Sequence, residues 1–148
     1  MLALALENNC TLQELVLPFN RFGDEGAKAI GQSLPRWKGL LSLQIQFNLF
    51  SEHGFESIVK GIAHNCQLKS VYLLNAGPSN RRVDKLFEDM QHFINLNRAG
   101  RRVLNEQVPK ASLWPFILDK ASRAYGPNGI FFMLRERPDA VSLPGTGR

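Results

Sequence analysis

The stretch LQELVL at residues 12–17 decides the fold, because the chain repeats its apolar pattern at a constant step of 28 residues. Two further copies stand at residues 40–45 (LLSLQI) and 68–73 (LKSVYL). The same step connects other apolar positions: Leu15, Leu43 and Val71; Leu17, Ile45 and Leu73; Ala27, Phe55 and Val83; Ile30, Ile58 and Leu86; Leu34, Ile62 and Met90. Three copies in one register, without a gap, predict a repeat architecture.

Each copy changes its periodicity partway along. Leu15 and Leu17 are two residues apart, which is the spacing of one face of a strand. Ala27, Ile30 and Leu34 then follow at steps of three and four, which is the spacing of one face of a helix. Each unit is therefore expected to be a strand, a turn and a helix.

Small or polar residues stand just before the expected helices, at the equivalent positions Gly23, Ser51 and Ser79. A serine there can accept a hydrogen bond from the open amides of the first helical turn, and glycine is tolerated. One strand and one helix cannot bury their own apolar face. The units must therefore stack, with the strands on a concave side and the helices on a convex side.

The patterns LxxLxLxxN at residues 12–20 and LxxLxIxxN at residues 40–48 resemble the leucine-rich-repeat family. The 28-residue length is similar to the ribonuclease-inhibitor-like class of that family. The resemblance covers roughly residues 1–90 and implies an α/β solenoid. It also implies that Asn20 and Asn48 form a buried ladder whose amides satisfy backbone groups of the bend. The third copy departs from the pattern, because Ala76 stands where the asparagine should be.

The ends of the chain follow the pattern less closely. Leu2 and Leu6 stand at the positions of Ile30 and Leu34, so the chain begins inside a repeat's helix, and we expect the N-terminus to be truncated. We place the solenoid, of about three repeats, at residues 1–97.

Residues 98–148 are expected to form a helical cap over the last repeat, whose core face would otherwise be exposed. Residues 94–97 are either a short closing strand, which we favour, or part of a third helix that runs on to about Leu104. Apolar spacing predicts a helix over Leu113 to Arg123, a turn at residues 125–129, and a second short helix ended by Pro138. The tail resembles one found on other leucine-rich-repeat proteins, and that likeness implies no activity.

Charge and cysteine content restrict the partners and the compartment. The net charge is +5, with 6 basic and 6 acidic side chains up to Asn75 and 12 basic and 7 acidic ones from Ala76 onward. Two cysteines form neither a secreted disulfide framework nor a zinc pattern. The apolar start lacks a basic flank and is too short for a signal peptide or a membrane span. We expect a cytoplasmic protein.

No constellation in the sequence supports catalysis, so we predict that the protein is not an enzyme. His53, His64 and His92 lie on or beside predicted helices and have no nucleophile next to them in sequence. Cys10 and Cys66 occupy one position of the repeat, where small buried thiols are ordinary usage in the resembled family. We expect no metal, no cofactor and no small-molecule substrate.

The concave face is the predicted binding surface, and its partner is expected to be a protein. Its candidate residues are the outward-pointing side chains of the strands: Glu14, Ser42 and Ser70; Val16, Gln44 and Tyr72; Pro18, Gln46 and Leu74. These rows mix aromatic, amide and apolar groups with little charge, which suits a protein better than a phosphate backbone. Phe19 and Phe47 come one residue later, and we expect them to pack against each other instead of lying exposed.

Two alternatives use the tail. Arg98, Arg101 and Arg102 form a basic feature that could contact nucleic acid, although basic residues on a tail are usually a solvated face. The pattern Leu96-x-x-x-Gly100-x-x-x-Leu104, followed by Val108-Pro109 and Leu113, is loosely similar to the box by which ubiquitin-ligase adaptors dock. Glycine replaces the usual cysteine of that box, and the downstream proline pattern is incomplete.

Overall fold

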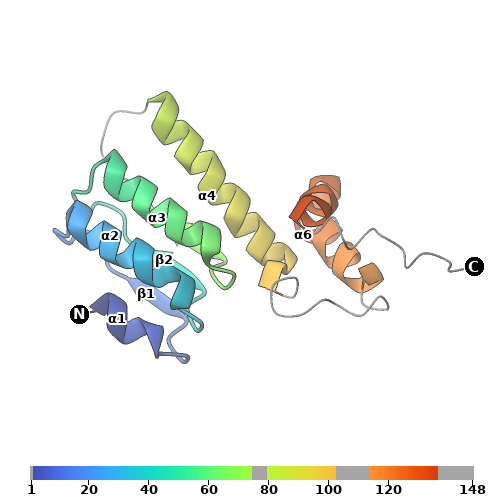
Figure 1. Ribbon diagram of the computed structural model, residues 1–148, viewed down its shortest axis with the longest axis horizontal. Coiled ribbons are helices and arrows are strands. Elements are labelled where there is room, and N and C mark those ends of the chain that lie inside the picture. The colour runs from blue at the N-terminus through green and yellow to red at the C-terminus, as the bar shows by residue number, and fades with distance from the viewer. Residues whose placement is uncertain (1, 75–79, 103–113, 137–148) are drawn as a thin grey trace, which may run out of the picture. The chain divides into compact units, whose positions relative to one another are not determined.

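The computed structural model describes residues 2–74, 80–102 and 114–136 of the chain (Figure 1). Three short strands, β1 (Glu14–Val16), β2 (Ser42–Gln44) and β3 (Ser70–Tyr72), form a parallel sheet in the order β1-β2-β3. Leu15 pairs with Leu43, and Leu43 pairs with Val71. The sheet register thus joins positions that are equivalent in the sequence pattern, and the predicted mixture of helices with parallel strands is confirmed.

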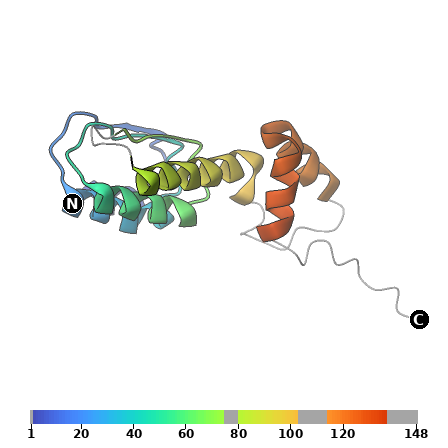
Figure 2. The same ribbon diagram turned by 90° about the horizontal axis from the view of Figure 1, so that it is seen from above.

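A helix follows each strand: α2 (Asp24–Ser33) after β1, α3 (Glu52–His64) after β2 and α4 (Arg81–Ala99) after β3. The short helix α1 (Leu2–Glu7) precedes β1, and the 3-10 turn η1 (Leu34–Arg36) extends α2. Figure 2 shows α2 and α3 together on one side of the sheet, so that the strands and the helices form two layers. One face of the sheet therefore packs on helices, and no helix in the described part of the chain covers the opposite face.

The core lies between these two layers and is built from the repeating apolar positions. Leu43 and Ile45 of the β2 segment and Ile58 and Ile62 of α3 are all fully buried. Leu15 and Leu17, at the equivalent positions of the β1 segment, are only half-buried. The middle unit is therefore covered on both sides, whereas the first unit is covered on one.

Asparagine side chains tie the bends to the strands before them. Asn48 is fully buried, and its Nδ2 donates to the carbonyl oxygens of Leu17 at 2.7 Å and of Ile45 at 3.0 Å. Asn20 lies exposed and donates to the carbonyl of Leu17 at 3.0 Å. The implied buried asparagine is thus present at Asn48, but the expectation that Asn20 is buried with it is wrong, because Asn20 lies exposed at the edge of the described units. Position 76 lies outside the described residues.

The helix starts differ in how they are capped. Ser51 accepts a hydrogen bond from the His53 amide at 3.1 Å, as predicted, whereas Gly23 has no side chain to do so. Ser79 lies outside the described residues. The cap of α4 is Asn80, whose Oδ1 accepts from two first-turn amides, those of Arg82 and Val83, each at 2.9 Å.

The favoured prediction of a closing strand at residues 94–97 is wrong, because α4 continues through these residues to Ala99. Nothing between Arg81 and Ala99 breaks a helix, since the segment contains neither glycine nor proline. Gly100, with φ of 101°, is the first glycine after the start of α4, and its amide donates to the Asn97 carbonyl at 3.1 Å. The helix therefore ends at a glycine of the usual C-terminal kind.

By internal contacts the chain divides into two compact units, Met1–Ile94 and Asn95–Arg148. The described part of the second unit contains α6 (Trp114–Glu136), which is interrupted at Gly126, with φ of 64° and ψ of −160°. Its small core comprises Ala99, Ile117, Ala121 and Met133. The interruption is thus shorter than the turn predicted at residues 125–129. Gly126 is the residue with non-helical backbone angles, and Pro127 begins the next helical segment directly after it. Pro138 lies outside the described residues.

Candidate protein-interaction surface

The side chains on the face of the sheet away from the helices form what we call the open sheet face. Side chains alternate along a strand, so the neighbours of the core residues Leu15, Leu43 and Val71 point away from the helices. The strand pairing sets these neighbours in rows, with Glu14 beside Ser42 and Ser70, and Val16 beside Gln44 and Tyr72. The third row, just beyond the strands, comprises Pro18, Gln46 and Leu74.

Apolar side chains are among the most exposed groups on this face. Val16 is 50% exposed, Tyr72 55% and Leu74 57%. The acidic side chain in the rows, Glu14, accepts a hydrogen bond from Gln44 Nε2 at 2.9 Å across the β1–β2 pair. The carboxylate is therefore held in place on a surface that mixes exposed apolar and polar groups, an arrangement that can orient a partner without dominating its binding.

Phe19 and Phe47 lie at the end of the open sheet face and stack on each other. Their ring centroids are 4.7 Å apart and their planes differ by 16°, so the predicted mutual packing is confirmed. The expectation that packing would hide them is wrong, because Phe19 remains 76% and Phe47 41% exposed. Both have a left-handed backbone, with φ of 56° and 59°. This conformation is uncommon outside glycine, and it turns both rings out of the bend.

Leu49 was missed by sequence reasoning. It is 73% exposed and has φ of 41°, so the bend of the second unit presents a further apolar side chain next to the phenylalanine pair. No spacing rule marks position 49, because it lies outside the strand and helix periodicities. Exposure there follows from backbone conformation and not from the apolar pattern.

Residues 8–31 match the family model described as Leucine Rich repeat. The match covers β1, the bend that follows it and most of α2, and it supports a leucine-rich-repeat protein. No curated protein matches the chain. Leucine-rich repeats commonly mediate protein–protein interactions and are typically non-catalytic. Among the described residues, no helix is both long enough and apolar enough to cross a membrane.

Outside the open sheet face, the described part of the first compact unit holds few chemistry-bearing side chains of the kinds singled out in the sequence. His53 and His64 are exposed and His92 is half-buried. Within residues 2–74, 80–102 and 114–136, no three His, Cys, Asp or Glu side chains gather as metal ligands would. The expectation of buried thiols is wrong, because Cys10 is exposed and Cys66 only half-buried. That position of the repeat is a surface turn, not a core site.

The tail residues singled out in the sequence do not form one surface feature. Arg98 and Arg102 are exposed, but Arg101 is only 9% exposed and so presents little of its cation to solvent. In the adaptor-like box, Leu96 is buried. Leu104, Val108-Pro109 and Leu113 lie outside the described residues.

A carboxylate at the start of α2 binds the residue that caps α3. Asp24 accepts hydrogen bonds from the Ser51 hydroxyl at 2.7 Å and from the Ser51 amide at 2.6 Å. The hydrogen bond from the hydroxyl is the larger cause, and with that from the amide it holds the pKa of Asp24 below its ordinary value. Glu52, at the start of α3, accepts similarly from Asn80 Nδ2 at 3.2 Å and pairs with Arg82 at 2.8 Å.

We expect Asp24→Asn to reduce stability at pH 7 and to weaken its dependence on acid. A carboxyl whose pKa is lowered by folding stabilises the fold above its unfolded pKa, and this stabilisation is lost as pH falls through the folded value, below about pH 4. Urea unfolding at pH 7, 4 and 3 should therefore show a smaller loss for Asp24→Asn than for the wild type. Glu25→Gln, at the exposed neighbour, is the control. Equal pH dependence in all three proteins would contradict the expectation.

Proposed function

We propose that the chain is a non-catalytic scaffold that binds a protein partner through the open sheet face. The observation that carries this proposal is the alignment of exposed side chains on three adjacent parallel strands, with Val16 and Tyr72 half-exposed around a carboxylate held by Gln44. In this proposal the units form a solenoid of the ribonuclease-inhibitor-like class. The open sheet face is then its concave side.

The composition of the open sheet face favours a protein over a nucleic acid. Binding to a phosphate backbone depends on lysine and arginine side chains, and the rows of this face contain none. Exposed tyrosine and apolar side chains beside amides are typical of protein interfaces, where aromatic groups contribute much of the binding free energy. The phenylalanine pair extends this apolar area beyond the strands.

The test compares three versions of the full chain as affinity baits, with quantitative mass spectrometry of the captured proteins. The first is the wild type and the second carries Glu14→Ala, Gln44→Ala and Tyr72→Ala. The third is a matched control with three exposed helix-layer residues replaced, Lys28→Ala, Gln32→Ala and His64→Ala. Thermal melting confirms that all three fold.

We expect a set of proteins captured by the wild type and the control variant but lost from the open-face variant. A captured protein is then purified and titrated against the three baits, where the same ranking should appear. Retention of every partner by the open-face variant would show that this face does not bind and would overturn the proposal.

A further inference from the structure

The outer edge of β1 presents backbone groups of a sheet that ends there. Within the described residues, β1 pairs only with β2. The amide of Leu17 donates to the Gln44 carbonyl of β2 at 2.8 Å, and the amide of Phe19 donates to the Gln46 carbonyl, just beyond β2, at 3.1 Å. Since backbone groups alternate in direction along a parallel strand, the N–H and C=O groups of Glu14 and Val16 point to the opposite, outer edge.

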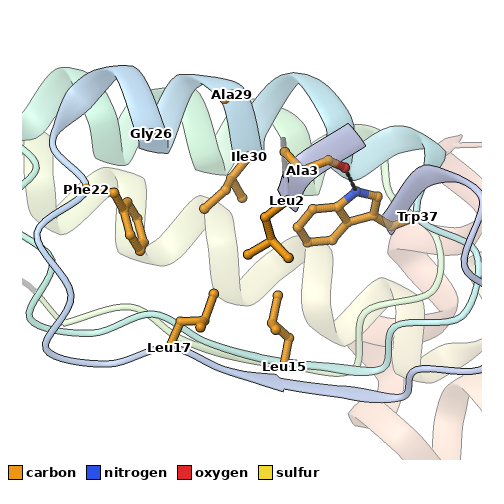
Figure 3. Close-up of a pocket in the computed structure, with 9 residues that line it drawn as sticks. All are labelled: Leu2, Ala3, Leu15, Leu17, Phe22, Gly26, Ala29, Ile30 and Trp37. Carbon is orange, nitrogen blue, oxygen red and sulfur yellow. Dashed lines mark hydrogen bonds between the residues drawn. The ribbon is translucent and has the colours of Figure 1, made fainter. Parts of the chain in front are cut away.

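An apolar pocket of about 190 Å³ adjoins this edge (Figure 3). Leu15 and Leu17 form its floor, and Leu2, Phe22, Ile30 and Trp37 line the rest. The lining contains no charged side chain, and the indole N–H of Trp37 already donates to the Ala3 carbonyl at 3.0 Å. An apolar cavity of about 150 Å³ can hold a benzene-sized guest, so this pocket has room for a branched aliphatic side chain.

The next strand shows what an occupied site of this kind contains. Leu43 and Ile45, the counterparts of Leu15 and Leu17, are fully buried. The neighbouring strand β1 covers them on one side. Its backbone pairs with β2, and its side chains Leu15 and Leu17, two residues apart, pack against the same core cluster. A further strand outside β1, with a similar pair of apolar side chains two residues apart, would therefore fill the pocket in the same way.

We propose that the outer edge of β1 and this pocket bind an extended peptide segment as a parallel strand, with two aliphatic side chains, two residues apart, facing Leu15 and Leu17 and at least one of them entering the pocket. The peptide would extend the existing parallel sheet by one strand. Its backbone groups would therefore pair with those of Glu14 and Val16, as the backbone of β1 pairs with β2. Pro18 has no N–H, so the added ladder is short on that side. Backbone hydrogen bonds to the edge and burial of the aliphatic side chains together supply the affinity, and the pocket supplies the selectivity for aliphatic groups. This site is distinct from the open sheet face.

The probe is a synthetic peptide with the chain's own sequence of residues 39–48 (GLLSLQIQFN), flanked by lysines for solubility. It is titrated into the isotope-labelled full chain and followed by nuclear magnetic resonance. We expect saturable shifts at Leu15, Leu17 and Ile30 and slower amide exchange at Glu14 and Val16. The control peptide carries serine at the positions of Leu43 and Ile45 and should not bind.

Two variants separate the edge from the pocket. Val16→Pro removes an outward N–H while leaving the inward donors of Leu17 and Phe19, and its control, Val16→Thr, keeps the N–H. Ala29→Phe fills the pocket from an exposed helix position, and its control is Lys28→Phe at the exposed neighbouring position. We expect Val16→Pro and Ala29→Phe, but neither control, to weaken binding by about tenfold or more, because burying one aliphatic side chain exceeds the free energy of a tenfold change.

Three outcomes would overturn this proposal: no binding by the wild type, equal binding of the serine peptide, or unchanged affinity in both test variants. Shifts confined to Gln44 and Tyr72 would also overturn it, because they would place the peptide on the open sheet face. If Val16→Pro shows no cooperative melting, Ala29→Phe alone decides. The open-face variant carrying Glu14→Ala, Gln44→Ala and Tyr72→Ala should still bind the peptide, so the two proposals can fail independently.

Discussion

Gly61→Ser should destabilise the protein by about 3 kcal/mol, at the upper end of the usual cost of overpacking. The helices α2 and α3 cross where Gly31 meets Gly61, and both glycines are buried. A Cβ at Gly61 would lie 2.2 Å from the Gly31 carbonyl oxygen and 2.9 Å from the Gly31 Cα. These are backbone atoms, which can retreat only if the two helices separate. Urea unfolding followed by circular dichroism measures the loss.

Gly23→Ser is the matched control, since it makes the same substitution where there is room. No heavy atom lies within 4 Å of a Cβ built at Gly23. Its backbone, with φ of −75° and ψ of −153°, is close to that of the capping residue Ser51, with φ of −79° and ψ of −173°. We therefore expect a gain of a few tenths of a kcal/mol, about the difference between serine and glycine as helix caps. Equal losses in Gly61→Ser and Gly23→Ser would contradict the proposed role of the helix crossing.

Leu43→Ala should lower the free energy of unfolding by about 2–5 kcal/mol, the usual cost of removing most of a buried leucine. Leu43 is fully buried in the middle strand, where β1 and β3 flank it on both sides. A cavity there adjoins both neighbouring units and cannot collapse by the movement of one alone. Chemical denaturation measures the effect. A lower midpoint with an unchanged slope of the free energy of unfolding against denaturant concentration identifies a loss of stability.

Leu74→Ala removes the same atoms from a side chain that is 57% exposed. Exposed substitutions of this kind usually change stability by less than about 0.5 kcal/mol. If Leu43→Ala were no more damaging than Leu74→Ala, the middle strand could not be the centre of the core. The comparison also provides a folded variant of the open sheet face for binding experiments.

The strand register could be predicted from sequence because one spacing rule governs it. Leu15, Leu43 and Val71 pair as the pattern requires, since each must bury its side chain in the same layer. The rule fails at Ile94 and Leu96, whose apolar character fits a buried helix face as well as a strand. A short apolar run does not distinguish the two, and only the first helix breaker, Gly100, does so.

The candidate surface could be predicted only in part. The alternation of side chains identified the rows of the open sheet face, including Val16 and Tyr72, but it gave no information on the bends. Phe19 and Phe47 both stack and stay exposed, because their left-handed backbones turn the rings outward, and residue type alone does not signal that conformation. The pocket beside β1 could not be predicted from the sequence pattern either. It exists because β1 is the edge strand of the sheet, with no further strand paired to its outer side among the described residues.

The carboxylates at the helix starts have a consequence for changes of chain length. Asp24 binds the residue that caps α3, and Glu52 binds the residue that caps α4. Insertion or deletion of one whole strand–helix unit would leave each helix start facing another of the same kind. A change of a few residues within a unit would move the carboxylate away from its cap. Such a chain can therefore be lengthened or shortened in complete modules, as happens by gene duplication, far more readily than by small steps.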